Sequence, residues 1–314
     1  MNKERLGKKV IIVSPRQKYG GSIVLHLLCQ LLIEENIDAR VFLTEVYGNK
    51  NDNYFKFVLK WIIWAIKDTL KVILSKCFNK KFIDFENEPI KKYRRKYLPF
   101  INRKNTIVIY PEVCYGNILK AKYVIRWFLY YNRYKTDEKA YGKDDIFICY
   151  RKKFNDYELN PDCKQLKISH FNNELYKQTN FRDRNGCCYI VRKGSGRKDL
   201  PTEYNGPIID NLTEREKVEA FNKYKYCYLY DTQTMYAKIA GYCGCIPIVI
   251  PEQGKNVDDY LNAEDVRYGV AYGDTNDEIN YAINTNIELK EYLDSLMQKN
   301  KKEVESFIKI LKEL

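Results

Sequence analysis

Residues 228–252, with the sequence YLYDTQTMYAKIAGYCGCIPIVIPE, decide the fold class of this chain. An aromatic, apolar run ends at Asp231, and a helical pattern follows it as far as Gly241. The short apolar run 246–250 comes next and is closed by Pro251. A strand, a helix, a glycine turn and a buried strand in this order are typical of a parallel α/β unit.

The start of the helix in this stretch indicates a phosphate site. Asp231 is a good N-cap residue, and Thr232 and Thr234 follow it closely. Backbone N–H groups and the helix dipole attract anions at such an end. We therefore expect the helix to begin beside Asp231 and to hold a phosphate there.

Length and composition indicate a globular protein with two domains. The chain of 314 residues is long enough for two separate cores. Residues 151–162 are polar and contain Pro161, so we expect one domain over 1–160 and a second over 161–314. The 10 Cys and 2 His show no spacing that suits a metal, and no signal peptide is visible. Buried free thiols and a cytoplasmic, reducing location follow as expectations.

The net excess of positive charge lies in the first half of the chain. Residues 1–160 contain 32 Lys and Arg against 17 Asp and Glu, whereas residues 161–314 contain 22 against 24. Such asymmetry indicates that the first half meets an anionic surface, which is membrane headgroups, nucleic acid or a phosphorylated lipid.

The segment Tyr54–Phe78 (YFKFVLKWIIWAIKDTLKVILSKCF) has a helical pattern but is too often charged to span a bilayer. Two interpretations remain open, a helix lying in the membrane interface and a helix packed on its own domain with its lysines in water. The basic cluster Lys91–Lys96 favours the membrane, and with it a peripheral location on the inner face of the plasma membrane. The lysines of the segment that share one narrow sector of the helix are Lys56, Lys60, Lys67 and Lys71.

The chain opens with the pattern of a β-α-β unit. A strand over 9–14 is followed by a loop that ends in Gly20 and Gly21, and a helix is expected from Ser22. The double glycine is not a G-x-G-x-x-G motif, so a dinucleotide site is poorly supported. The two glycines instead let the backbone approach a substrate or cross the sheet closely, and we place the acceptor on this side.

Two further segments of the first half carry candidate contacts. The strand 106–110 is followed by Pro111 and Glu112. Glu112 thus lies just past the carboxyl end of the strand, where α/β proteins place catalytic carboxylates and where a carboxylate also serves as a local cap. Residues 121–131 are expected to be helical, with Arg126 as a candidate anion contact.

In the second half, a strand over 187–191 leads into RKGSGRK, residues 192–198. Arg192 and Lys193 at a strand end, followed by Gly194, suit a diphosphate, and a basic turn in solvent is the plain alternative. The sequence lacks G-x-x-x-x-G-K-[ST], so this is not the P-loop of an NTPase. From Thr275 to Leu314 a long helical region has periodic apolar positions, which predicts that it packs on the body.

The second half resembles the donor domain of bacterial GT-B glycosyltransferases that build capsule, O-antigen and lipopolysaccharide sugars. The resemblance lies in YDTQTMYAKIAGYCGCIPIVIPE, in VRKGSGRK and in YGVAYG at 268–273. It implies two Rossmann-like domains that face a cleft. It also implies hexosyl transfer, without a cofactor, from a UDP or GDP sugar to a hydroxyl of a lipid-linked surface glycan. The residues that it assigns to the donor are Arg192, Lys193, Tyr230, Asp231, Thr232 and Thr234.

The chain departs from the family pattern in one respect. Retaining GT-B enzymes carry two Glu seven residues apart at this helix, where this chain has Asp231 and Lys238, so the stereochemistry stays open. No D-x-D occurs, which favours a site without a metal, where cations and a helix N-terminus neutralise the leaving group.

Two other classes of function compete with sugar transfer as explanations of this sequence. A non-catalytic basic protein that docks on membranes or nucleic acid explains the charge but not the donor-like second half, and no nucleic-acid signature is present. An NAD(P)-dependent oxidoreductase needs a glycine fingerprint that Gly20 and Gly21 do not supply.

Overall fold

The computed structural model describes residues 6–16, 20–77, 94–232, 234–261 and 266–314. The chain forms two compact units, unit 1 with Met1–His170 and Met297–Leu314, and unit 2 with Phe171–Leu296. The division therefore lies at His170 rather than at residue 160, because Leu166 and Ile168 are buried in the core of unit 1. The last helix also belongs to unit 1 and not to the second domain.

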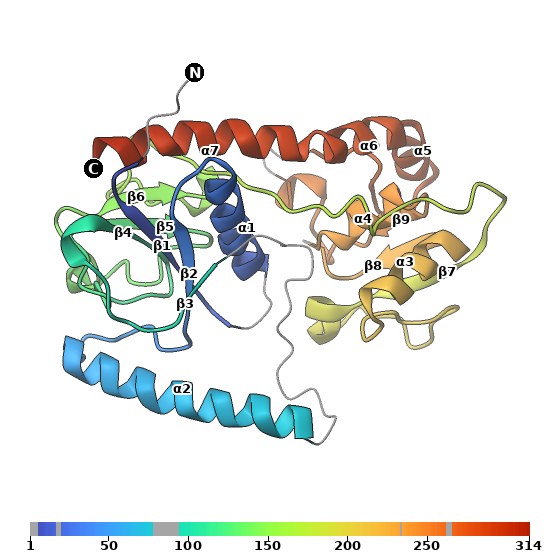
Figure 1. Cartoon of the computed structure of the whole chain (residues 1–314). Coiled ribbons are helices and arrows are strands. Elements are labelled where there is room, and N and C mark those ends of the chain that lie inside the picture. The colour runs from blue at the N-terminus through green and yellow to red at the C-terminus, as the bar shows by residue number, and fades with distance from the viewer. Residues whose placement is uncertain (1–5, 17–19, 78–93, 233, 262–265) are drawn as a thin grey trace. The chain divides into compact units, whose positions relative to one another are not determined.

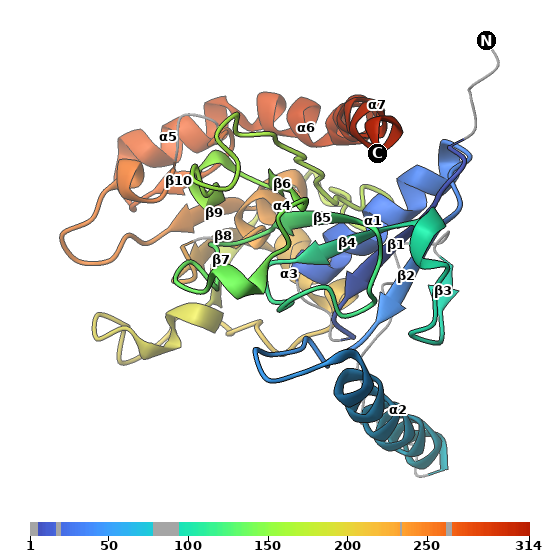
Figure 2. The same cartoon turned by 90° about the vertical axis from the view of Figure 1, so that its left-hand side faces the viewer.

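Unit 1 is built on a six-stranded, fully parallel sheet in the order β3-β2-β1-β4-β5-β6 (Figure 2). This order reverses between β1 and β4, which are adjacent in the sheet. In doubly wound α/β sheets such a reversal marks the position where ligands bind, beyond the carboxyl ends of the strands. The strands are β1 (Lys9–Ser14), β2 (Ala39–Leu43), β3 (Arg95–Lys96), β4 (Thr106–Pro111), β5 (Tyr123–Phe128) and β6 (Ile146–Cys149).

Strand β5 corrects the expectation of a helix over 121–131. The strand is buried from Val124 onwards, and both of its faces are covered. A short run that is apolar on both sides cannot be told from a buried helix by periodicity alone. Arg126 is fully buried and forms an ion pair with Asp145 at 2.7 Å from Nε to Oδ2, so it is not available to an anion.

Helices cover both faces of this sheet (Figure 1). Helices α1 (Gly20–Glu34) and α7 (Leu296–Glu313) share one core, in which Val304, Phe307 and Leu311 of α7 are buried. The predicted packing of the terminal helix is thus confirmed. On the other face, α2 (Tyr54–Cys77) is anchored by Phe57 and Trp61.

Two local expectations for unit 1 change. Gly20 and Gly21 are the first residues of α1 rather than the end of a loop. The cluster Lys91–Lys96 lies partly outside the described residues, and its last two residues form β3.

Unit 2 has a four-stranded parallel sheet in the order β10-β9-β8-β7. A capping box of Thr213 and Glu216 begins α3. The helical region after Thr275 is broken at Thr285 and at Ser295 into three helices. The strands and helices of this unit are β7 (Asn185–Ile190), α3 (Glu214–Lys223), β8 (Tyr224–Leu229), α4 (Tyr236–Tyr242), β9 (Ile246–Val249), β10 (Ala271–Tyr272), α5 (Asn276–Asn284) and α6 (Asn286–Asp294).

Two properties predicted from composition can be compared with the described residues. The described cysteines are free thiols, and most of them are buried, in agreement with the expectation. No helix among the described ranges has the length and apolar character needed to cross a membrane.

Candidate functional site

The carboxyl edge of the unit 2 sheet brings the basic turn and the end of β8 together. Strands β7 and β8 are neighbours, and the N–H of Tyr230 donates to the carbonyl of Ile190 at 2.8 Å. The turn Arg192–Gly196 follows β7 at once. A Cβ on Gly194 would lie 2.4 Å from the carbonyl oxygen of Tyr230, so only glycine allows this approach. Residues 192–194 therefore lie against the backbone at Tyr230.

Asp210 fixes the backbone of the basic turn. Arg192 has a φ of 38°, a left-handed conformation that is uncommon for residues other than glycine. The carboxylate of Asp210 accepts the N–H groups of Val191 at 3.1 Å and of Arg192 at 2.8 Å. Sequence reasoning missed this residue. The only signal was a carboxylate directly after the short apolar run 207–209, which lies beside β7 through the bridge Tyr189–Ile208.

The side chain of Arg192 lies over an aromatic ring. Its guanidinium carbon is 5.2 Å from the ring centroid of Tyr236, within the range of a cation–π contact. The hydroxyl of Tyr236 donates to Glu214, which also accepts from Tyr176 at 2.8 Å. These contacts hold an exposed guanidinium at the sheet edge, and neither Tyr236 nor Glu214 was predicted as part of the site.

Glu214 stays ionised in this network. Burial by itself would raise its pKa, but the hydroxyl donors Tyr236 and Tyr176, together with Lys217, bring the pKa below its ordinary value. Burial, with Glu214 as its neighbour, raises the pKa of Tyr236, so the phenol keeps its proton and remains a donor.

The remaining cations of the loop divide into two kinds. Arg197 is structural, because its guanidinium donates to the carbonyls of Ile250 at 2.7 Å and Pro251 at 2.9 Å. Lys193 and Lys198 are exposed, and within the part of the chain that the structure describes neither forms an ion pair. Lys193 is adjacent in sequence to Gly194, which contacts the backbone of Tyr230, whereas Lys198 is farther along the loop. Of the two exposed lysines, Lys193 is therefore better placed for a ligand at this edge.

The start of α4 differs from the prediction. The helix begins at Tyr236 rather than beside Asp231, which is only 4 % exposed and continues the buried end of β8. The N-cap residue is Met235, without a side-chain capping bond, and the hydroxyl of Thr234 before it accepts the N–H of Tyr236 at 3.4 Å. Thr232 and Thr234 are half-buried in the connecting segment at the same sheet edge.

The residues predicted for the acceptor side gather at the strand reversal of unit 1. A Cβ on Gly21 would lie 3.3 Å from Leu129, and the N–H of Leu129 donates to Glu112 at 3.1 Å. Burial raises the pKa of Glu112 above its ordinary value, although the N–H groups of Leu129 and Tyr130 oppose the shift. A half-buried carboxylate with a raised pKa, at the carboxyl end of β4, can act as a general base or as a local cap.

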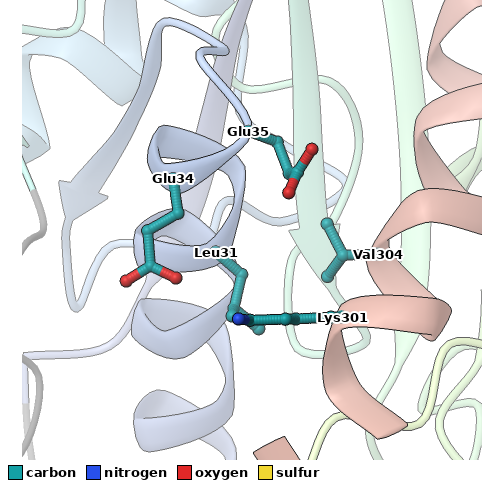
Figure 3. A pocket seen from close by; sticks show the side chains of 5 residues that line it. All are labelled: Leu31, Glu34, Glu35, Lys301 and Val304. Atoms are coloured by element: carbon teal, nitrogen blue, oxygen red, sulfur yellow. The ribbon is translucent and has the colours of Figure 1, made fainter. Parts of the chain in front are cut away.

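A separate small hollow lies between α1 and α7 and is not part of this edge (Figure 3). Its volume of about 130 Å³ is far below the roughly 300–1,000 Å³ of small-molecule sites. It lies near the carboxyl end of α1, which leads to the amino end of β2, so it is at the opposite edge from Glu112. The residues that line it are Leu31, Glu34, Glu35, Lys301 and Val304.

No group of three or more His, Cys, Asp or Glu side chains within the described ranges is arranged to hold a metal ion.

No family model matches this chain, and no curated protein matches it in sequence. Among solved structures, a glycosyltransferase from Rickettsia africae ESF-5 aligns over 99 % of this chain and 99 % of its own, with a TM-score of 0.51 at 8 % identity. The chain shares the fold of that protein. The two Rossmann-like α/β units expected from the sequence are therefore confirmed as a fold of the GT-B type.

A weaker similarity is to an alpha-glucosyltransferase in complex with UDP and a 13-mer DNA. It covers 96 % of this chain and 95 % of that one, with a TM-score of 0.44 and 11 % identity.

Proposed function

We propose that this protein transfers a hexosyl group from a nucleoside-diphosphate sugar to a hydroxyl of a surface glycan, of the capsule, O-antigen or lipopolysaccharide class. The donor is a UDP or GDP sugar, and the acceptor is linked to a lipid. The observation that carries the proposal is the close approach of Gly194 to Tyr230, which holds two cations at the carboxyl edge of a parallel sheet.

The donor half of the proposal rests on charge placed where a leaving group needs it. When the bond from the anomeric carbon to the diphosphate oxygen breaks, negative charge develops on the nucleoside diphosphate. Arg192, supported by Tyr236, and the exposed Lys193 would stabilise that charge. Tyr230, Asp231, Thr232 and Thr234 would line the donor pocket. We propose that these groups replace a metal ion and that no cofactor takes part.

The acceptor half rests on Glu112. As the new glycosidic bond forms, the attacking hydroxyl loses its proton, and a carboxylate with a raised pKa is suited to accept it. Gly21, which lies against Leu129 beside Glu112, leaves room for the acceptor close to the backbone.

The docking protein without catalytic activity is the less favoured alternative. Contact with a membrane or nucleic acid needs only exposed lysines and arginines. It does not need Arg192 held in a left-handed backbone conformation by Asp210, and such local strain is typical of ligand sites.

The test is calorimetric titration with UDP and GDP, followed by turnover of a panel of nucleotide sugars. We expect one of the two nucleotides to bind, and Lys193→Ala to weaken that binding by about tenfold or more, because a charge-assisted contact is lost. Turnover should continue in the presence of EDTA.

The matched control is Lys225→Ala. Lys225 is also exposed but lies in the first half of β8, so the same charge is removed near the opposite edge of the sheet. This variant should bind the nucleotide like the unchanged protein. If neither UDP nor GDP binds, the proposed function is wrong; equal loss in both variants would remove Lys193 from the site.

A further inference from the structure

Helix α2 carries a continuous apolar surface that no other described element covers. Only one side of the helix packs on the sheet of unit 1, through Phe57 and Trp61. The opposite side is open in both views (Figures 1 and 2). Eight large apolar side chains on it are between 42 % and 76 % exposed, and they are Phe55, Leu59, Ile62, Ile63, Ile66, Leu70, Ile73 and Leu74. We call this surface the α2 face.

The α2 face is a single stripe with a row of cations beside it. At about 100° per residue, the eight side chains fall within an arc of about 120° centred opposite the buried side. Lys56, Lys60, Lys67 and Lys71 follow at one border of that arc. As one of the two interpretations expected, α2 packs on its own domain through Phe57 and Trp61 and exposes its lysines, but it also turns these eight apolar side chains outward.

Acidic side chains are missing from the α2 face. The single acidic residue of α2 is Asp68, whose side chain is 14 % exposed and pairs with Arg16 on the buried side. Lys60 pairs with Asp52 just before the helix, while the other three lysines of the row have no carboxylate within ion-pair distance among the described residues.

The shape of the surface suits flexible apolar chains. A shallow open hollow of about 370 Å³ runs along the helix and is lined by Trp61, Ile62, Ala65, Ile66, Thr69 and Leu70. A wide apolar arc bordered by lysines, on a unit with a large excess of positive charge, combines the two requirements of an interfacial helix at an anionic bilayer.

We propose that α2 lies in the plane of an anionic membrane, with the α2 face among the upper acyl chains and its lysines at the phosphates of the lipid headgroups. The partner is the bilayer surface and not a second protein. The proposal does not depend on sugar transfer, because it concerns a surface on the far side of α2 from the sheet and can be measured without a donor.

The experiment is co-sedimentation of the full chain with vesicles of phosphatidylcholine alone and of phosphatidylcholine mixed in equal parts with phosphatidylglycerol. We expect binding to the mixed vesicles, weakened by added salt. The double variant Ile66→Ser/Leu70→Ser should bind at least about tenfold more weakly, because it removes apolar area that enters the membrane. Lys56→Gln/Lys67→Gln should weaken binding to the mixed vesicles only.

The matched control is Ile283→Ser/Ile287→Ser, which removes two isoleucines from α5 and α6 of unit 2 that are 49 % and 70 % exposed, against 56 % and 53 % for Ile66 and Leu70. This variant should bind like the unchanged protein, and thermal unfolding checks that every variant is folded. Absence of binding to mixed vesicles would overturn the proposal. So would a dimer, seen by sedimentation equilibrium, that Ile66→Ser/Leu70→Ser converts to monomer, because the α2 face would then be an interface between two copies.

Discussion

At Gly194 one missing methyl group determines where two cations lie. The backbone of the turn approaches Tyr230 more closely than any Cβ would permit, and Asp210 fixes the conformation of Arg192 next to it. The sequence contains two glycines in this turn, Gly194 and Gly196, and nothing local distinguishes them. Only the neighbouring strand makes Gly194 essential.

The prediction at this scale is that Gly194→Ala lowers the free energy of unfolding of unit 2 by about 1–3 kcal/mol, as overpacking does. The added methyl must also push the turn away from Tyr230, so nucleotide binding should be lost. Urea unfolding and calorimetric titration measure the two effects.

Gly196→Ala is the control. A Cβ there meets no atom within 4 Å, so stability should change by less than about 0.5 kcal/mol and nucleotide binding should persist. Equal effects of the two substitutions would contradict the role given to Gly194.

Among the elements, α1 makes the stability of unit 1 depend on pH, because it carries a buried histidine. His26 lies on α1 with its side chain fully buried. Burial, with a smaller contribution from Arg95, lowers the pKa of His26 from 6.5 to about 3. Below pH 6.5 His26 is protonated in the unfolded chain but stays neutral in the folded chain. The free energy of unfolding is therefore highest above pH 6.5 and decreases as the pH falls toward 3.

We expect the protonation of His26 to lower the free energy of unfolding of unit 1 by about 2 kcal/mol when the pH falls from 7 to 5. His26→Gln removes the titration, so this variant should lose that much less stability over the same interval. Urea unfolding at the two pH values measures the difference.

His170→Gln removes the only other histidine, which is half-buried, and should keep the pH dependence of the unchanged protein. If His26→Gln also keeps it, the imidazole of His26 is protonated in the folded chain and the prediction is wrong.

In the whole molecule, the chain returns from unit 2 to unit 1 at its C-terminal helix. Helices α5 and α6 complete unit 2, with Leu289 and Leu293 in its core. Helix α7 then inserts Val304, Phe307 and Leu311 into the core of unit 1. The two cores therefore depend on different members of three successive helices.

We expect Phe307→Ala and Leu293→Ala to loosen different units. Each deletes a side chain that is 2 % exposed and should cost about 2–5 kcal/mol in its own core. Hydrogen exchange should show lost protection in β1, β2 and α1 for Phe307→Ala, and in β7, β8 and β9 for Leu293→Ala. Loss of protection in the same strands for both variants would contradict the division into two units.

Several features of the fold were predictable because they depend on neighbours in the sequence. The capping box at Thr213 and Glu216 was one, and the strand before Arg192 was another. The helix at the start of α2 and the parallel α/β unit at 228–252 also follow from local periodicity. Side chains three or four residues apart share a helix face whatever the rest of the chain does.

Where the prediction failed, the deciding partners are distant in sequence. The local sequence of β5 predicts a helix, but β5 pairs with β4 and β6 as a strand. The position of Arg126 predicts an anion contact, but its guanidinium forms an ion pair with Asp145. Asp231 was predicted as a helix N-cap, but it is buried just after the end of β8.

The sequence by itself determined that this protein has two α/β halves and that its net excess of positive charge lies in the first half. It also determined that a basic, glycine-containing turn follows a strand in the second half. The tertiary structure alone decided that this turn lies against Tyr230, that α7 belongs to the first unit, and that α2 turns its apolar side outward. The reason is that burial is a property of what packs against a residue, and those partners come from remote parts of the chain.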